Sequence, residues 1–140
     1  MIGGKPLYAF IGGGAAGAAA SLTTNGTIHT FTIPFKCIPI RAGVTITTAV
    51  TVTSPVLTFG AAGICGAITI PVSTAANYTV YDDTDYVSAG TGTWAASLDE
   101  GDQVAVVLSV QATAGAGIPF LIVEVSPEMA GNNSVMIKSA

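Results

Sequence analysis

Charged side chains are scarce in this chain. Of its 140 residues only 9% are Asp, Glu, Lys or Arg, with four cations against eight acids, and there is one histidine. Ordinary soluble domains are about 25% charged. Four scattered cations cannot form a phosphate-neutralising patch, so nucleic-acid binding is disfavoured. A single histidine also leaves few groups for acid–base catalysis.

Long apolar runs are missing as well. Residues 6–35 and 42–81 carry no charge, but Gly, Pro, Asn and many Thr interrupt both stretches. Neither holds the roughly 20 consecutive apolar residues of a membrane-spanning helix, and the few aromatic residues do not supply the girdles of a small membrane barrel. A hydrophobic content of 50% disfavours disorder. We therefore expect one folded domain with no membrane partner.

Cysteine is nearly absent. Cys37 and Cys65 are too few for a disulfide framework and lack the paired spacing of a zinc site. The sequence leaves two alternatives open: a single disulfide between Cys37 and Cys65, or two buried free thiols. The sequence gives no basis for a metal or another cofactor.

Residues 1–26 are rich in Gly and Ala and predict an extended N-terminal arm. Lys5, an apolar stretch at 7–11 and the alanines at 18–20 imitate a signal peptide, but the apolar stretch is short and runs directly into glycines. Small side chains bury too little area to offset the entropy of ordering an arm. We expect its anchors, Leu7, Tyr8, Phe10 and Ile11, to be held by another subunit or by the domain's own surface.

Residues 12–17 match the G-x-G-x-x-G pattern, which is similar to the dinucleotide fingerprint of flavoproteins. The acidic residue expected about 20 positions later is absent, because the first carboxylate is Asp82. No later segment has the helical period that a doubly wound sheet requires. Dinucleotide binding is kept only as a second alternative.

Most of the chain after residue 26 has a period of two. In residues 44–53, Val and Ile alternate with Thr and Ala, which predicts a strand with one face in the core and a threonine face outward. Pro34 and Pro39 indicate an edge or a bend. Further strands are predicted at 30–35, 64–70, 78–80, 86–87, 104–111, 120–125 and 135–137.

Turn residues separate these strands, among them the acidic turn at 99–102 and a Gly/Ala loop at 112–117. Seven to nine strands at roughly ten-residue spacing predict an all-β fold, an antiparallel β-sandwich with jelly-roll topology over residues 27–140.

Residues 98–104 and the segment that opens the strand at Phe120 resemble the closing strands of trimeric jelly-roll heads of the tumour-necrosis-factor and complement C1q type. Similar heads tip phage fibres and spore filaments. The chain is poor in charge and rich in Gly, Ala and Thr, and residues 39–43 lead into a Val/Thr strand. In these features it also resembles decoration or cement proteins of tailed-phage capsids. These resemblances imply a role in assembly.

Few residues suggest chemistry. His29 has no discernible nucleophile or orienting carboxylate nearby and is expected to be packed or solvent-facing. Asp82, Asp83 and Asp85 could offer oxygens to Ca²⁺ but do not fit the twelve-residue calcium loop, and a turn explains them better. Trp94 is expected to be buried, with a role as an exposed contact residue as the alternative.

The sequence therefore predicts a non-enzymatic structural virion protein without a cofactor. It would be a decoration or cement subunit on the capsid surface, a homotrimer in contact with the major capsid protein or other virion subunits. The main alternative is the receptor- or glycan-binding head of a phage fibre or spore-surface filament.

Overall fold

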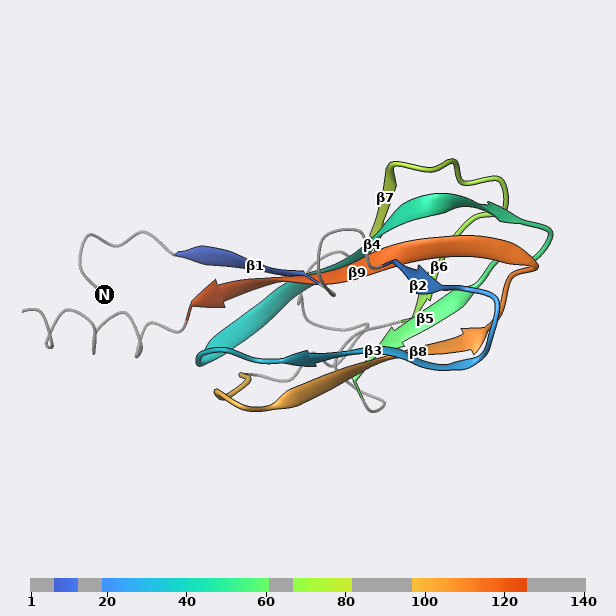
Figure 1. Ribbon diagram of the computed structural model, residues 1–140. Coiled ribbons are helices and arrows are strands. Elements are labelled where there is room, and N and C mark those ends of the chain that lie inside the picture. The colour runs from blue at the N-terminus through green and yellow to red at the C-terminus, as the bar shows by residue number, and fades with distance from the viewer. Residues whose placement is uncertain (1–6, 13–18, 61–66, 82–96, 126–140) are drawn as a thin grey trace, which may run out of the picture.

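The computed structural model describes residues 7–12, 19–60, 67–81 and 97–125 (Figure 1). These residues form strands and connections without any helix, and two antiparallel sheets pack against each other. Consequently, no helix in this part of the chain is long and apolar enough to cross a membrane. The predicted all-β sandwich is confirmed.

Each sheet is assembled from strands that are distant in sequence. Sheet A has the order β1–β9–β4–β7, and β2 also pairs with β9. Its strands are β1 (Tyr8–Gly12), β2 (Ala20–Ser21), β9 (Ala114–Val125), β4 (Cys37–Thr51) and β7 (Tyr78–Tyr81). Sheet B has the order β3–β8–β5–β6, formed by β3 (Gly26–Thr32), β8 (Gln103–Val110), β5 (Val56–Phe59) and β6 (Ile68–Thr69).

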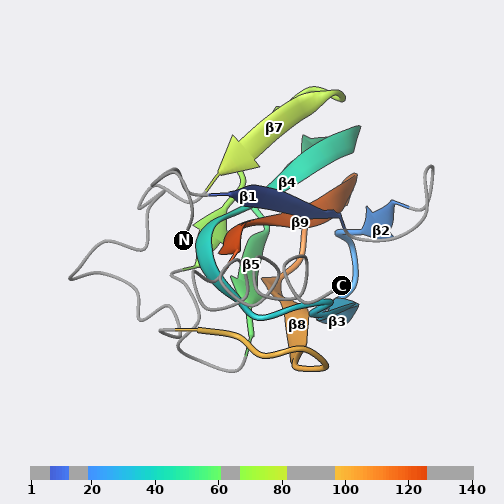
Figure 2. The same ribbon diagram turned by 90° about the vertical axis from the view of Figure 1, so that its left-hand side faces the viewer.

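The two sheets form the upper and lower layers of Figure 1, and the end-on view of Figure 2 shows them stacked. The chain passes from one sheet to the other at nearly every step after β2, and only β5 and β6 are consecutive neighbours in one sheet. Such repeated crossing wraps the strands as in a jelly roll.

The core lies between the sheets and takes alternate residues from the strands. In β8, Val104, Val106 and Leu108 are buried, as their spacing predicts, but Val110, which continues the same alternation, is 41% exposed beside an irregularity in the pairing with β5. In β4, Val44 and Ile46 point into the same core. The largest fully buried side chains include Phe59, Leu22, Ile33, Ile46, Leu57, Ile68, Ile70, Leu108 and Leu121.

Strand β4 departs from its predicted form at both ends. It starts at Cys37, well before residue 44, and its pairing with β9 is irregular between Pro39 and Arg41. Pro39 therefore sits at a bend, as expected of a residue that cannot donate to the ladder. Further shifts beyond Ile46 break the strict alternation, and Val52, predicted to face the core, is 72% exposed.

Val52 is the central residue of a tight turn. Its φ is 71°, and the Thr53 N–H donates to the Thr51 carbonyl oxygen at 2.9 Å. A γ-turn with positive φ is rare and strained, and a β-branched side chain is especially disfavoured there.

We expect Val52→Gly to raise the free energy of unfolding by about 1 kcal/mol, because glycine adopts positive φ without the steric cost of Val. Urea denaturation measures the change. The control is Val72→Gly at another exposed valine without positive φ, which should lower stability by about 0.5–1 kcal/mol. Equal losses in the two variants would contradict the strain at Val52.

The Gly/Ala loop predicted at 112–117 is wrong, because β9 already begins at Ala114. Gly117 lies opposite Ile46 of the adjacent strand β4, where a Cβ atom would come within 2.6 Å of Val44 Cγ2 and 3.0 Å of the Thr45 carbonyl oxygen. Glycine there serves the close approach of two strands. Amino-acid composition alone does not distinguish a glycine in a closely packed strand from a glycine in a loop.

The acidic turn before β8 is confirmed. The Asp102 N–H donates to the Asp99 carbonyl oxygen at 3.1 Å, and Gly101 has a φ of 90°. The Asp102 carboxylate accepts the Asp99 N–H at 2.9 Å. The Asp102 side chain thus caps the turn by accepting a backbone N–H, as Asp side chains commonly do.

The segment predicted as an arm contributes to sheet A. Strands β1 and β2 both pair with β9, and the Leu22 side chain is fully buried in the core. The Leu22 N–H donates to the Gly115 carbonyl oxygen at 3.0 Å. The division of the chain at residue 26 stays a prediction.

Several predicted features lie outside the described residues. These are most of the glycine motif after Gly12, Cys65, the acidic residues at 82–85, Trp94, and the strands predicted at 86–87 and 135–137. Only the end of the strand predicted at 64–70 is described, as β6.

Candidate interaction surface

The outer face of sheet A carries an apolar patch beside a few polar side chains, among them Arg41, Thr45 and Glu124. Residues directly opposite each other in a ladder share one side of the sheet, and β1 and β9 place Tyr8 opposite Glu124 and Phe10 opposite Ile122. Their neighbours Ala9 and Ile11 pack against the core, so Tyr8 and Phe10 point outward. We call this surface the apolar face; it comprises Tyr8, Phe10, Ile38, Ile40, Ile118, Phe120 and Ile122.

Two stacked phenyl rings lie on the apolar face because glycines leave room for them. The rings of Phe10 and Phe120 have centroids 5.0 Å apart and planes inclined by 26°. A Cβ atom on Gly43 would come within 2.5 Å of Phe120 Cζ, and one on Gly12 within 3.2 Å of Phe10 Cε1. Phe120 is almost fully buried, whereas Phe10 is 66% exposed. The stack therefore presents one aromatic ring to the outside.

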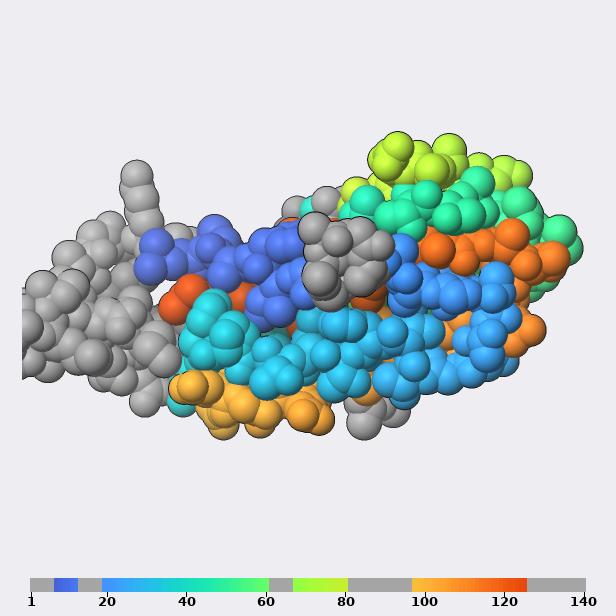
Figure 3. Space-filling view, viewed as in Figure 1, coloured from blue at the N-terminus to red at the C-terminus, as the bar shows by residue number. Residues whose placement is uncertain are grey.

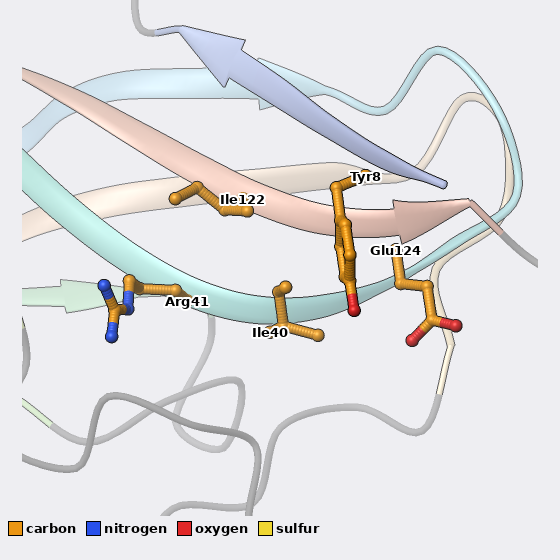
Figure 4. Close-up of a pocket in the computed structure, with 5 residues that line it drawn as sticks. All are labelled: Tyr8, Ile40, Arg41, Ile122 and Glu124. Atoms are coloured by element: carbon orange, nitrogen blue, oxygen red, sulfur yellow. The ribbon is translucent and has the colours of Figure 1, made fainter. Parts of the chain in front are cut away.

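An open pocket of about 370 Å³ lies beside this stack. Tyr8, Ile40, Arg41, Ile122 and Glu124 line it, and in Figure 4 the Tyr8 ring reaches from β1 past β9 toward β4. The extra residue of the β4 irregularity, Ile40, helps to form its floor. The pocket thus combines an aromatic ring and two isoleucines with one cation and one anion.

The outer face of sheet B is different in character. It carries mainly hydroxyl side chains among its described strands: Thr30, Thr32, Thr58, Thr69 and Ser109. Hydroxyl groups can bond to water on an exposed sheet face, whereas exposed aromatic and aliphatic side chains gain by being covered. Among the described residues, the outer faces of the two sheets therefore differ in chemistry: sheet A presents aromatic and aliphatic side chains, and sheet B presents mainly hydroxyl groups.

The structure separates the four predicted anchors into two groups. Ile11 packs against the core of its own chain. Leu7, Tyr8 and Phe10 are 57%, 60% and 66% exposed, although the backbone of β1 is held along β9. Figure 3 shows this blue segment lying along the surface of the sandwich. Their role as contacts with another subunit stays a prediction.

Sequence reasoning missed the residues beneath the anchors, namely Gly43, Phe120, Ile122 and Ile40. The alternation around Phe120 predicts a strand but does not say which of its faces is covered. One usable signal was Gly43, which directly precedes the run of β-branched residues, because a glycine within a strand often marks the close approach of another group.

The described residues contain no group of three or more His, Cys, Asp and Glu side chains that could hold a metal ion. The His29 ring packs edge-on against Phe31, with centroids 4.8 Å apart and planes at 76°, so His29 is a packed residue.

Cys37 is a fully buried free thiol, so it does not form the disulfide that the sequence left open. Burial, and secondarily the negative charge of Asp102, raises the pKa of this thiol from 9.0 to about 11. The reactive thiolate is therefore suppressed at neutral pH, which does not suit a nucleophile.

The raised pKa makes stability depend on pH. Above pH 9 the unfolded chain loses the thiol proton while the folded chain keeps it up to about pH 11, so the stability present below pH 9 is lost across this interval. By pH 10 we expect a loss of about 1.4 kcal/mol from this group. Guanidinium denaturation of wild type and Cys37→Ala between pH 8 and pH 10 isolates the contribution. Identical pH slopes in the two proteins would contradict it.

No protein-family model, curated protein or solved structure matches this chain.

Proposed function

We propose that this protein is a non-enzymatic structural subunit of a virion, a capsid decoration or cement protein that forms a homotrimer and binds the capsid surface. The supporting observation is the apolar face, where the Phe10 ring projects from an aromatic stack. Interface centres are depleted in charge and enriched in aromatic residues and Arg. The charged side chains that line the pocket on this face are Arg41 and Glu124.

Such a subunit would act through binding energy alone. Contacts that exist only in the assembled shell stabilise that state over the dissociated state by mass action. A charge-poor sandwich suits this function, because few ionic groups must be desolvated when its face is covered.

The alternative is a receptor- or glycan-binding head. The pocket supports it, because an aromatic ring, that of Tyr8, lines the same pocket as the charged side chains of Arg41 and Glu124. Apolar walls with a few polar groups are typical of small-ligand sites. The dinucleotide alternative has no such support, since Gly12 ends an antiparallel edge strand and the fingerprint requires a parallel strand followed by a helix.

Adding the purified chain to capsids that lack it tests the proposal. We expect saturable binding with threefold clusters in electron microscopy, and capsids that withstand higher temperature before releasing their contents. A chain without residues 1–12 should bind far more weakly. Binding of wild type to a glycan array without any binding to capsids would favour the alternative and contradict the proposal.

A further inference from the structure

Strand β1 is attached to the sandwich by backbone pairing and by three side chains, those of Ala9, Phe10 and Ile11. Five residues pair in register with β9, and the Val125 N–H donates to the Leu7 carbonyl oxygen at 2.7 Å. Among its side chains, Ala9 and Ile11 pack against the core, whereas Tyr8 and Phe10 are more than half exposed. Backbone pairing of this kind is also how an edge strand accepts a strand from another chain.

The connection after β1 is longer than its path requires. Gly12 pairs with Phe120 and Ala20 with Gly117, so the two ends lie about 10 Å apart along β9. The seven intervening residues are all Gly or Ala and can span about 25 Å when extended. The connection is therefore long enough for β1 to leave the β9 edge of its own chain.

We propose that in the assembled protein β1 of one copy pairs with β9 of a neighbouring copy, so that the strand is exchanged. The inference rests on the proposed assembly function. We assign the strand that pairs with the β9 edge to a second copy of this chain, because the edge already matches β1 residue by residue: Leu121 and Val123 lie opposite Ile11 and Ala9. Exchange keeps every one of these contacts, as in other domain-swapped oligomers.

Local concentration decides between the two arrangements. A tethered strand has an effective concentration in the millimolar range, so a dilute single copy keeps its own β1. In an oligomer, the β9 edge of a neighbouring copy is chemically identical to that of the same chain. Its effective concentration around β1 is then comparable to that of the chain's own β9 edge. Each exchanged strand then links two subunits, and its Phe10 ring stacks on Phe120 of the neighbour.

Paired single-cysteine variants test the exchange. Leu7 and Val125 form a hydrogen-bonded pair of the antiparallel ladder. The next pair, Tyr8 and Glu124, is therefore a non-hydrogen-bonded pair, in which the Cα atoms are about 4.5 Å apart. This spacing allows a disulfide. In a Cys37→Ala, Cys65→Ser background, one sample carries Tyr8→Cys and another Glu124→Cys. The two are mixed, unfolded, refolded together, allowed to assemble and then oxidised.

We expect a disulfide-linked dimer between the two variants on a non-reducing gel of the assembled fraction, and at least tenfold less when Val52→Cys replaces Glu124→Cys. Sedimentation of the same samples reports assembly separately. Oligomers without the linked dimer would overturn the exchange and leave the assembly proposal standing. Monomers alone would overturn both. A chain carrying both cysteines that closes only within itself in the oligomer would also overturn the exchange.

Discussion

A chain carrying Phe10→Asp should remain folded but lose its capacity to assemble. We expect the dissociation constant for self-association and for capsid binding to rise at least 100-fold, which corresponds to about 3 kcal/mol. The Phe10 ring is 66% exposed and rests on Phe120. The aspartate would remove the projecting ring and place an unpaired charge where the partner should exclude water.

The matched control is Val52→Asp. Val52 is an apolar side chain that is even more exposed, at 72%, and lies in the turn after β4 rather than on the apolar face. It receives the same charge and should assemble as wild type does. Analytical ultracentrifugation measures self-association, and circular dichroism verifies the fold. Equal loss in both variants would point to a nonspecific effect of charge, and no loss in Phe10→Asp would remove the apolar face from the interface.

The second large effect is expected from Gly117→Ala, which should lower the free energy of unfolding by about 3 kcal/mol. The added methyl would meet Val44 Cγ2 at 2.6 Å, the Thr45 carbonyl oxygen at 3.0 Å and Ile46 Cδ1 at 3.3 Å. Overpacking of this kind costs typically 1–3 kcal/mol. A backbone oxygen on the neighbouring strand cannot move aside as a side chain can, so the upper end of the range applies.

A double-mutant cycle with Val44→Ala identifies the cause. Val44→Ala alone should also destabilise, since it leaves a cavity in the core. Because it removes the closest clashing atom, the double variant should be less destabilised than the sum of the single changes by at least 1 kcal/mol. Chemical denaturation of the four proteins gives the coupling. If the changes in the free energy of unfolding were strictly additive, the Val44 side chain would not be the group for which Gly117 leaves room.

The strands were predictable wherever a single period of two persists. Residues 104–108 alternate without interruption, and their buried set is the expected one. The prediction failed at Val52 and at residues 114–117, where bulges and glycines change the relation between sequence position and sheet face. A one-residue shift moves every later side chain to the opposite face, so an error at one bulge propagates along the strand.

The candidate surface was predictable only in part. Leu7, Tyr8 and Phe10 stood out as apolar residues beside a glycine-rich segment, and all three are more than half exposed. Phe120 gave no comparable signal, because it lies next to the core residue Leu121 in an unbroken apolar run. Its place beneath Phe10 depends on the pairing of β1 with β9, which joins residues more than 100 positions apart.

The sequence by itself determined an all-β chain with few charges, a Gly/Ala-rich N-terminal segment and a turn at 99–102, because these follow from local periodicity, composition and turn chemistry. Only the tertiary structure decided that sheet A has the apolar outer face and sheet B the hydroxyl face. It also decided that glycines at 43 and 117 admit neighbouring groups. These features depend on strand order and register, which long-range packing sets and local patterns do not encode.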